Sequence, residues 1–101
     1  MIHELLSHGA ANAIPGNQLA ATLNMELREL TQIIERERQA GFPICASVVR
    51  GGAGYFMPAT AEELALYCCS LDRRLRNIRR TRDAMGHALS EMVGQEYVGG
   101  W

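Results

Sequence analysis

The feature that most restricts the fold of this chain is a break between two short amphipathic segments in GNQLAATLNMELRELTQIIERERQAG, residues 16–41. The first segment places Leu19 and Leu23 on one face of a helix of about two turns. Asn24 follows directly, and Asn is second only to Gly in adopting the left-handed conformation that ends a helix. A second helix begins near Glu26. Two helices joined by so tight a turn cross at a steep angle, so the segment predicts a helix-turn-helix.

The second helix of this pair is expected to span residues 26–40. Leu30, Ile33 and Ile34 recur at helical spacing, so they are expected to face the core. Gly41 follows the last helical residue, at the position where glycine commonly ends a helix. The helix therefore has a defined start, an apolar face and a defined end.

A shorter helix is expected before the pair, because Ile2, Leu5 and Leu6 recur at helical spacing. It is predicted to end near Gly9. Residues 10–16 contain a Pro-Gly pair, which predicts a loop or turn.

The periodicity changes after the second helix of the pair. The stretch ICASVVR, residues 44–50, is rich in residues that suit a β-strand, and RGGAG provides a reversal. A second short strand, YFM, covers residues 55–57 and is ended by Pro58. The pattern predicts a β-hairpin over about residues 43–58.

The last and longest helix is predicted to begin at a capping box formed by Thr60 and Glu63. Apolar residues then recur with alternating gaps of four and three over about four heptads, interrupted by Arg82. The positions of this seam are Leu64, Cys68, Leu71, Leu75, Ile78, Arg82, Met85, Leu89 and Met92. We expect the helix to cover residues 60–93, and residues 94–101, which are rich in glycine, to form a flexible tail.

Length and composition are those of one folded domain. The chain has 101 residues, of which 48% are hydrophobic and 21% charged, and its formal net charge is −1. Any contact with nucleic acid must therefore come from local charge. The start of the chain lacks the pattern of a secretory signal, and no stretch approaches the about 20 apolar residues of a membrane span. We expect a cytoplasmic location.

Cysteines and histidines give no support to catalysis or metal binding. Cys45, Cys68 and Cys69 are odd in number and lack paired metal-ligand spacing, and we expect Cys45 and Cys68 to be buried as small hydrophobic residues. The histidines lie far apart along the chain, and the GGAG segment lacks the Lys-Ser/Thr of a phosphate-binding loop. We therefore expect no enzymatic activity, no metal site and no cofactor.

The order of these elements resembles a winged helix-turn-helix domain, in particular the small winged-helix proteins of bacteriophages and mobile elements. The resemblance covers roughly residues 1–80 and is carried by Leu23-Asn24-Met25, RELTQIIERERQAGFPI and GYFMP. Asn24 stands where the family usually has Gly, and Glu26 where it usually has Ser or Thr. The resemblance implies a mostly α fold with a small β-hairpin: a winged helix-turn-helix over residues 1–59 with its wing at about 43–58, followed by a long C-terminal helix.

The resemblance also implies a transcription regulator that binds double-stranded DNA. The second helix of the pair would enter the major groove. Its candidate base-reading residues are Leu27, Arg28, Thr31, Gln32 and Glu35. Candidate contacts to phosphate or sugar are Arg36, Arg50 at the wing, and Tyr55.

A protein-interaction module, acting as an adaptor or inhibitor of host machinery, is the alternative function. Glu26, Glu29 and Glu35 favour it, because carboxylates repel phosphate. A continuous basic stripe through Arg28, Arg36 and Arg50 would favour DNA, whereas an acidic face centred on these three glutamates would favour a protein partner. The charged residues of this helix could instead form a solvated surface with pairs three or four residues apart. A third possibility is a purely structural dimerisation unit, which would leave this helix without a ligand.

The last helix carries two further patterns. Six Arg fall within residues 73–82 without an acidic residue, which suits either a phosphate-binding surface or the polar face of an amphipathic helix. A helix over residues 61–92 would span about 48 Å, longer than the about 26 Å diameter of a domain of this size. We expect part of it to project and form a homodimer, the alternative being a seam packed within the chain. The predicted dimer-interface residues are Leu71, Leu75, Ile78, Met85 and Leu89.

Overall fold

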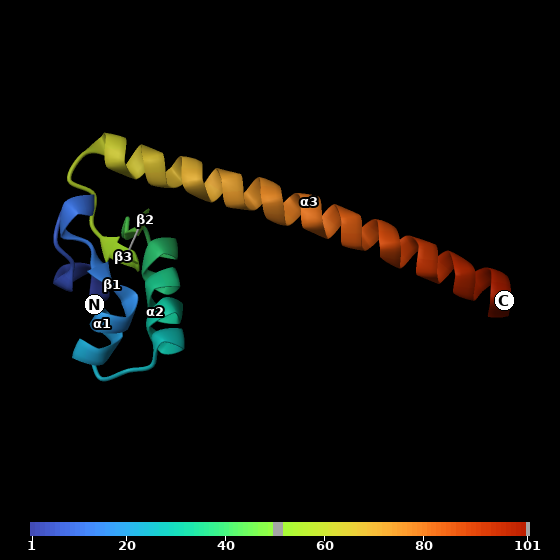
Figure 1. Ribbon diagram of the computed structural model, residues 1–101, viewed down its shortest axis with the longest axis horizontal. Coiled ribbons are helices and arrows are strands. Elements are labelled where there is room, and N and C mark those ends of the chain that lie inside the picture. Colours follow the sequence, from blue (N-terminus) through green and yellow to red (C-terminus); the bar gives the residue numbers. More distant parts are fainter. Residues whose placement is uncertain (50–51, 101) are drawn as a thin grey trace. The chain divides into compact units, whose positions relative to one another are not determined.

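The protein is mostly helical, with a small antiparallel sheet and a long C-terminal helix, in agreement with the coarse prediction (Figure 1). The structure is a computed structural model that describes residues 1–49 and 52–100. In chain order its elements are the 3-10 helices η1 (Ile2–Leu5) and η2 (Ala10–Asn12), strand β1 (Ile14–Pro15), helices α1 (Gly16–Thr22) and α2 (Leu27–Gln39), strands β2 (Cys45–Val49) and β3 (Gly52–Phe56), and helix α3 (Ala61–Gly100). The chain divides into two compact units, Met1–Cys68 and Cys69–Trp101.

The break between α1 and α2 is a Schellman motif with Asn24 in the left-handed conformation. Its φ is 53°, and no other residue except glycine has a positive φ in the part of the chain that the structure describes. The Met25 amide donates to the Ala20 carbonyl at 3.0 Å, and the Asn24 amide donates to the Ala21 carbonyl at 3.1 Å. These bonds satisfy the last carbonyls of α1 and reverse the chain, so the predicted turn at Asn24 is confirmed.

The same motif ends α2. Gly41 has a φ of 104°, and the Phe42 amide donates to the Glu37 carbonyl at 3.0 Å. The predicted C-terminal stop at Gly41 is therefore confirmed.

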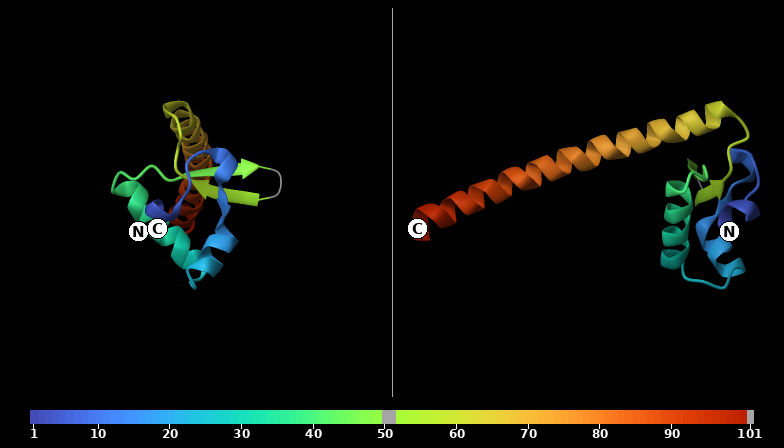
Figure 2. Two further views of the ribbon diagram at one scale, coloured as in Figure 1. Left: turned by 90° about the vertical axis from the view of Figure 1, so that its left-hand side faces the viewer. Right: turned by 180° about the vertical axis from the view of Figure 1, so that it is seen from behind.

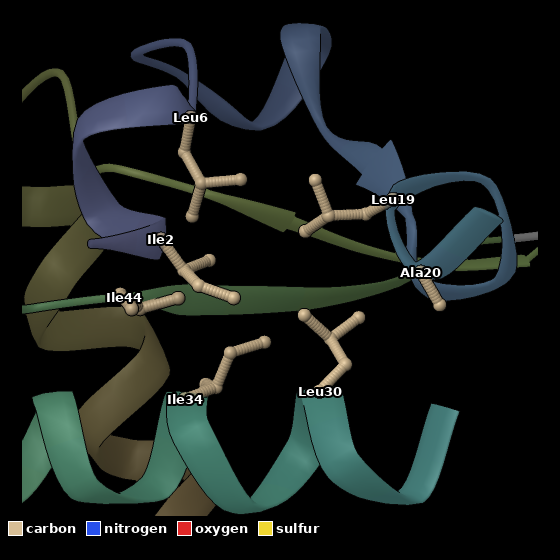
Figure 3. Close-up of a cluster of buried hydrophobic side chains, with 7 residues drawn as sticks. All are labelled: Ile2, Leu6, Leu19, Ala20, Leu30, Ile34 and Ile44. Carbon is tan, nitrogen blue, oxygen red and sulfur yellow. The ribbon is translucent and has the colours of Figure 1, made fainter. Parts of the chain in front are cut away.

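The main core joins α1 and α2 to the amino-terminal segment (Figure 3). Leu30 and Ile34 of α2 are fully buried, and Ile33 is half-buried against the same cluster, as predicted for this face. The buried residues of this cluster are Ile2, Leu6, Leu19, Ala20, Leu30, Ile34 and Ile44. Leu5 is exposed, because residues 2–5 form a single 3-10 turn, and the short helix predicted to end near Gly9 already ends at Leu5.

The sheet has the order β1-β3-β2, and the left view of Figure 2 shows β2 and β3 as the predicted antiparallel hairpin. Strand β1 falls where a loop or turn was predicted. Pro15 is compatible with it, because β1 is an edge strand and needs no donor on its outer side. Gly54 pairs with Pro15, and a Cβ at Gly54 would lie 2.7 Å from the Cβ of Ala13. The pairing of β1 with β3 therefore depends on the absence of a side chain at Gly54, in the middle of β3.

A buried carboxylate ties α2 to the amino-terminal segment. Glu37 accepts hydrogen bonds from the amides of Ile2 at 2.8 Å and His3 at 2.9 Å, and His3 Nδ1 lies 2.6 Å from its Oε1. The imidazole of His3 stacks on Phe42 with ring centroids 3.8 Å apart. Burial acts to raise the pKa of Glu37, but the hydrogen bonds from His3 and Ile2 outweigh it and lower this pKa.

Helix α3 begins as predicted, but its capping box is only half formed. The Glu63 amide donates to Thr60 Oγ1 at 3.2 Å. The Glu63 carboxylate does not return to Thr60 and instead accepts the amides of Ala59 at 2.8 Å and Ala10 at 3.0 Å. These two backbone bonds lower its pKa. One side chain thus joins the start of α3 to η2.

Two further expectations for the last helix need correction. Cys68 is exposed, whereas Cys45 is fully buried as expected, because Tyr67 and Leu64 are the α3 residues that pack on Cys45 and Phe56. The helix does not end near residue 93 but continues to Gly100. Isolated glycines cost a helix only about 1 kcal/mol each, and no proline follows Pro58.

Asn24 offers a direct test of the turn. Asn24→Ala should lower the free energy of unfolding by about 1 kcal/mol, because a Cβ without a local hydrogen-bonding group is disfavoured at this φ. Asn24→Gly should leave it nearly unchanged or raise it. Differential scanning calorimetry would compare the two variants. An alanine variant as stable as the glycine variant would contradict the role given to the left-handed backbone.

Glu37 should make stability depend on pH. Because its pKa is lower in the folded protein than the ordinary 4.5, its ionised form stabilises the fold above that pH, and this contribution disappears as the pH falls through the folded pKa. Glu37→Gln should cost about 1–3 kcal/mol at pH 7 and flatten the acid side of the profile. Urea unfolding between pH 3 and 7 measures both effects. Glu35→Gln, at an exposed position on the same helix, is the matched control and should cost less than about 0.5 kcal/mol, because it loses only a surface pair with Arg38.

Candidate nucleic-acid interface

The outward face of α2 is the surface on which most of the predicted contacts lie. Burying Leu30, Ile34 and Glu37 turns the opposite side of the helix to solvent. All five predicted base-reading residues are exposed, together with Arg36. The exposed residues of this face are Leu27, Arg28, Glu29, Thr31, Gln32, Glu35, Arg36 and Gln39.

Long polar side chains occupy the centre of this face. At about 100° per residue, Arg28, Gln32 and Gln39 lie opposite the buried residues of α2. Among the ion pairs of the described residues, none involves Arg28 or Arg36. Both guanidinium groups can therefore meet a ligand without first breaking an ion pair. Gln39 was not predicted as a site residue, although helical spacing from Gln32 and Arg28 could have identified it.

Two of the predicted base-reading residues are engaged within the helix. The Glu35 carboxylate lies 3.8 Å from Arg38 Nη1 and accepts from Gln39 Nε2 at 3.4 Å. Thr31 Oγ1 donates to the Arg28 carbonyl at 2.8 Å, so only its lone pairs are available to a ligand. Arg28 and Gln32 are thus the better placed pair for contacts outside the chain.

The charge of this surface is mixed. Glu26, Glu29 and Glu35 are exposed beside Arg28 and Arg36, so α2 carries neither a continuous basic stripe nor a purely acidic face. Charge by itself therefore does not decide between a nucleic-acid partner and a protein partner.

Tyr55 of β3 packs against the main core, and Arg38 of α2 lies beside its ring. The ring of Tyr55 is half-buried against the main core, with the Arg38 guanidinium 5.9 Å from its centroid. Arg38 also lies 5.1 Å from the ring of Tyr67, and its Nε donates to the Ile44 carbonyl at 2.8 Å. Tyr55 thus has a packing role in addition to its predicted contact. The predicted contact at Arg50 lies outside the described residues.

The second unit presents an apolar stripe and an arginine row on one helix. The predicted dimer-interface residues are exposed: Leu71 by 38%, Leu75 by 55%, Ile78 by 65%, Met85 by 68% and Leu89 by 62%. By helical spacing, Arg73, Arg76 and Arg80 lie on the opposite side of α3 from this stripe, and all three are exposed. The two features therefore do not compete for one face.

The described part of the chain has no group of three or more His, Cys, Asp or Glu residues that could hold a metal ion. The cysteines are free, and burial raises the pKa of the Cys45 thiol, which disfavours its reactive thiolate. Of the helices in the described residues, none is both long enough and apolar enough to cross a bilayer.

Comparison of the chain with models of protein families, with curated proteins and with solved structures found no significant match.

Proposed function

We propose that this chain is a winged helix-turn-helix protein that binds double-stranded DNA as a homodimer and regulates transcription for a bacteriophage or mobile element. The observation that best supports the proposal is the arrangement of α1, the Schellman turn at Asn24 and α2, whose polar outward face is exposed, followed by the β2–β3 hairpin. The sheet order β1-β3-β2 supports the same fold, because a short strand before the helix pair completes the sheet on which a wing is built.

In this proposal α2 is the recognition helix. Arg28 donates bidentately to guanine, and Gln32 pairs with adenine, since these are the geometric matches of their planar groups. Arg36 contacts phosphate and sets the register of the helix in the groove. Leu27, which is 44% exposed, contacts a thymine methyl.

Dimerisation through α3 is supported by the exposure of its apolar stripe. Large hydrophobic side chains on heptad spacing are typical of a helix that pairs with another helix. Arg73, Arg76 and Arg80 on the opposite side of α3 remain free for phosphate. Binding should therefore weaken steeply with salt.

A protein-interaction module is the second candidate, and the exposed carboxylates of Glu26, Glu29 and Glu35 favour it. In that case the outward face of α2 would bind a basic partner surface. Removing carboxylates from α2 would then weaken the interaction instead of strengthening it.

The first experiment titrates the purified protein into random-sequence duplex DNA at two salt concentrations, read by fluorescence anisotropy, with the mass measured by light scattering. Affinity that falls steeply with salt is the expected result. No binding at low salt by a folded dimer would reject the DNA proposal and leave the protein partner.

Arg28→Ala should weaken binding to a duplex selected from the random pool by about 1–3 kcal/mol, roughly 5- to 150-fold, and relax the preference at one base pair. Arg36→Ala is the matched control: it should weaken binding to all sequences alike. Anisotropy titrations on the selected duplex and on its single-base variants provide the comparison. Equal losses on every duplex for Arg28→Ala would remove it from base reading.

Removing negative charge from the outward face of α2 distinguishes the DNA-binding proposal from the protein-interaction proposal. Glu29→Gln combined with Glu35→Gln should tighten DNA binding by roughly 3- to 10-fold at low salt, because two carboxylates no longer repel the phosphates. Glu62→Gln combined with Glu91→Gln makes the same charge change on α3. Tightening by the α2 pair beyond that of the α3 pair supports recognition by α2, and weaker binding would contradict it.

A further inference from the structure

The exposed apolar stripe on α3 follows a heptad repeat. Charged residues within and beside this stripe distinguish a parallel from an antiparallel pair of α3 helices. In the repeat abcdefg, Leu75, Arg82 and Leu89 occupy position a. Position d holds Leu71, Ile78, Met85 and Met92. The positions that flank the stripe hold Arg74 at g and Arg79 at e.

A parallel pair in register would bring arginines together. Position a meets position a of the other helix, so Arg82 would face its own copy in the seam. Each Arg74 at g would meet Arg79 at e of the second copy, five residues further along. Asp72, also at e, would face Tyr67 and therefore neutralise neither contact. Parallel pairing thus places three like-charge contacts between residues 74 and 82, within little more than about two turns.

An antiparallel pair of α3 helices removes the contact between the two Arg82 side chains in the seam. Its layers join position a of one helix to position d of the other, so Arg82 never meets its copy. With the two-fold axis at residue 80, Leu71 lies opposite Leu89, and Leu75 lies opposite Met85. This register covers the whole stripe from Cys68 to Met92. One like-charge contact remains, between the two Arg79 side chains at the exposed edge, where Asp83 lies one turn away on each chain.

The conformation of Arg82 allows the seam to close in either orientation, so the choice of orientation rests on the layer partners of Arg82 and on the contacts of Arg74 and Arg79. Arg82 Nη1 lies 3.6 Å from Asp83 Oδ1, and the same atom lies 3.7 Å from the position that a Cβ on Gly86 would occupy. The guanidinium is therefore drawn off the stripe toward Gly86, where the absence of a side chain leaves room. In the antiparallel register the aliphatic stem of Arg82 would lie opposite Ile78 of the second copy and could cover it.

We infer that two copies of this chain pair along α3 in antiparallel orientation, with the two-fold axis near residue 80. The inference rests on the proposed homodimer and adds its geometry. The two Cys68 residues are separated by 24 residues of helix, about 36 Å, instead of facing each other.

Disulfide cross-linking of the full chain tests the orientation. In a Cys68→Ser, Cys69→Ser background, one chain carries Leu75→Cys and a second, extended by a tag that changes its mass, carries Met85→Cys. The mixture should form the mixed disulfide at least about tenfold faster than either variant forms a disulfide with itself, because pairing holds the two thiols at high effective concentration. Ser90→Cys, exposed and off the stripe, replaces Met85→Cys in the control mixture and should react at the background rate.

Each variant cross-linking to itself as fast as in the mixture would overturn the inference, because that is the parallel result. Faster reaction of Leu75→Cys with Ile78→Cys than with Met85→Cys would overturn the axis at residue 80. A monomeric mass by light scattering would overturn both the inference and the homodimer. DNA affinity is measured separately, so a monomer that binds DNA leaves recognition by α2 standing, and an antiparallel dimer without DNA affinity leaves this inference standing.

Discussion

Burial of one face of α2 is the interaction on which the rest of the first unit depends. Leu30 and Ile34 are almost fully removed from solvent, and they pack on residues from η1, α1 and the start of the hairpin (Figure 3). Because an α-helix repeats every 3.6 residues, burying this face determines which polar side chains turn outward. The proposed recognition surface is thus a consequence of core packing.

The position of α2 along its own axis is held at both ends by backbone bonds. Schellman motifs end α1 before α2 begins and end α2 itself, so neither helix can extend into the turn that follows it. Glu37 adds a third restraint by holding the amides of Ile2 and His3. The proposed reading of bases by α2 would need such restraint, since bidentate contacts to bases require side chains held in one position.

In the second unit, by contrast, the large hydrophobic side chains are exposed. Its heptad seam has no buried partner among the described residues, and its side chains from Leu71 to Met92 are exposed. A hydrophobic seam of this length is typical of a helix whose partner is another helix, and the arginines within and beside it restrict the orientation of that partner. The proposed DNA contacts and the proposed dimer therefore use separate surfaces of the chain.

Features that depend on near neighbours follow from the sequence alone. They are the turn at Asn24, the stop at Gly41, the apolar face of α2 and the start of α3, each set by residues a few positions apart.

Features that depend on distant partners arise only in the folded chain. Ile2 and Glu37 are 35 residues apart and Ala10 and Glu63 are 53 apart, and no local pattern signals that their backbone and side-chain groups will meet. Strand β1 forms for the same reason, because it requires the edge of β3, some 40 residues later, to accept it. The pair of Glu35 with Arg38 is local, since the two residues lie three positions apart on α2, whereas the half-buried position of Tyr55 depends on distant core residues that pack against its ring.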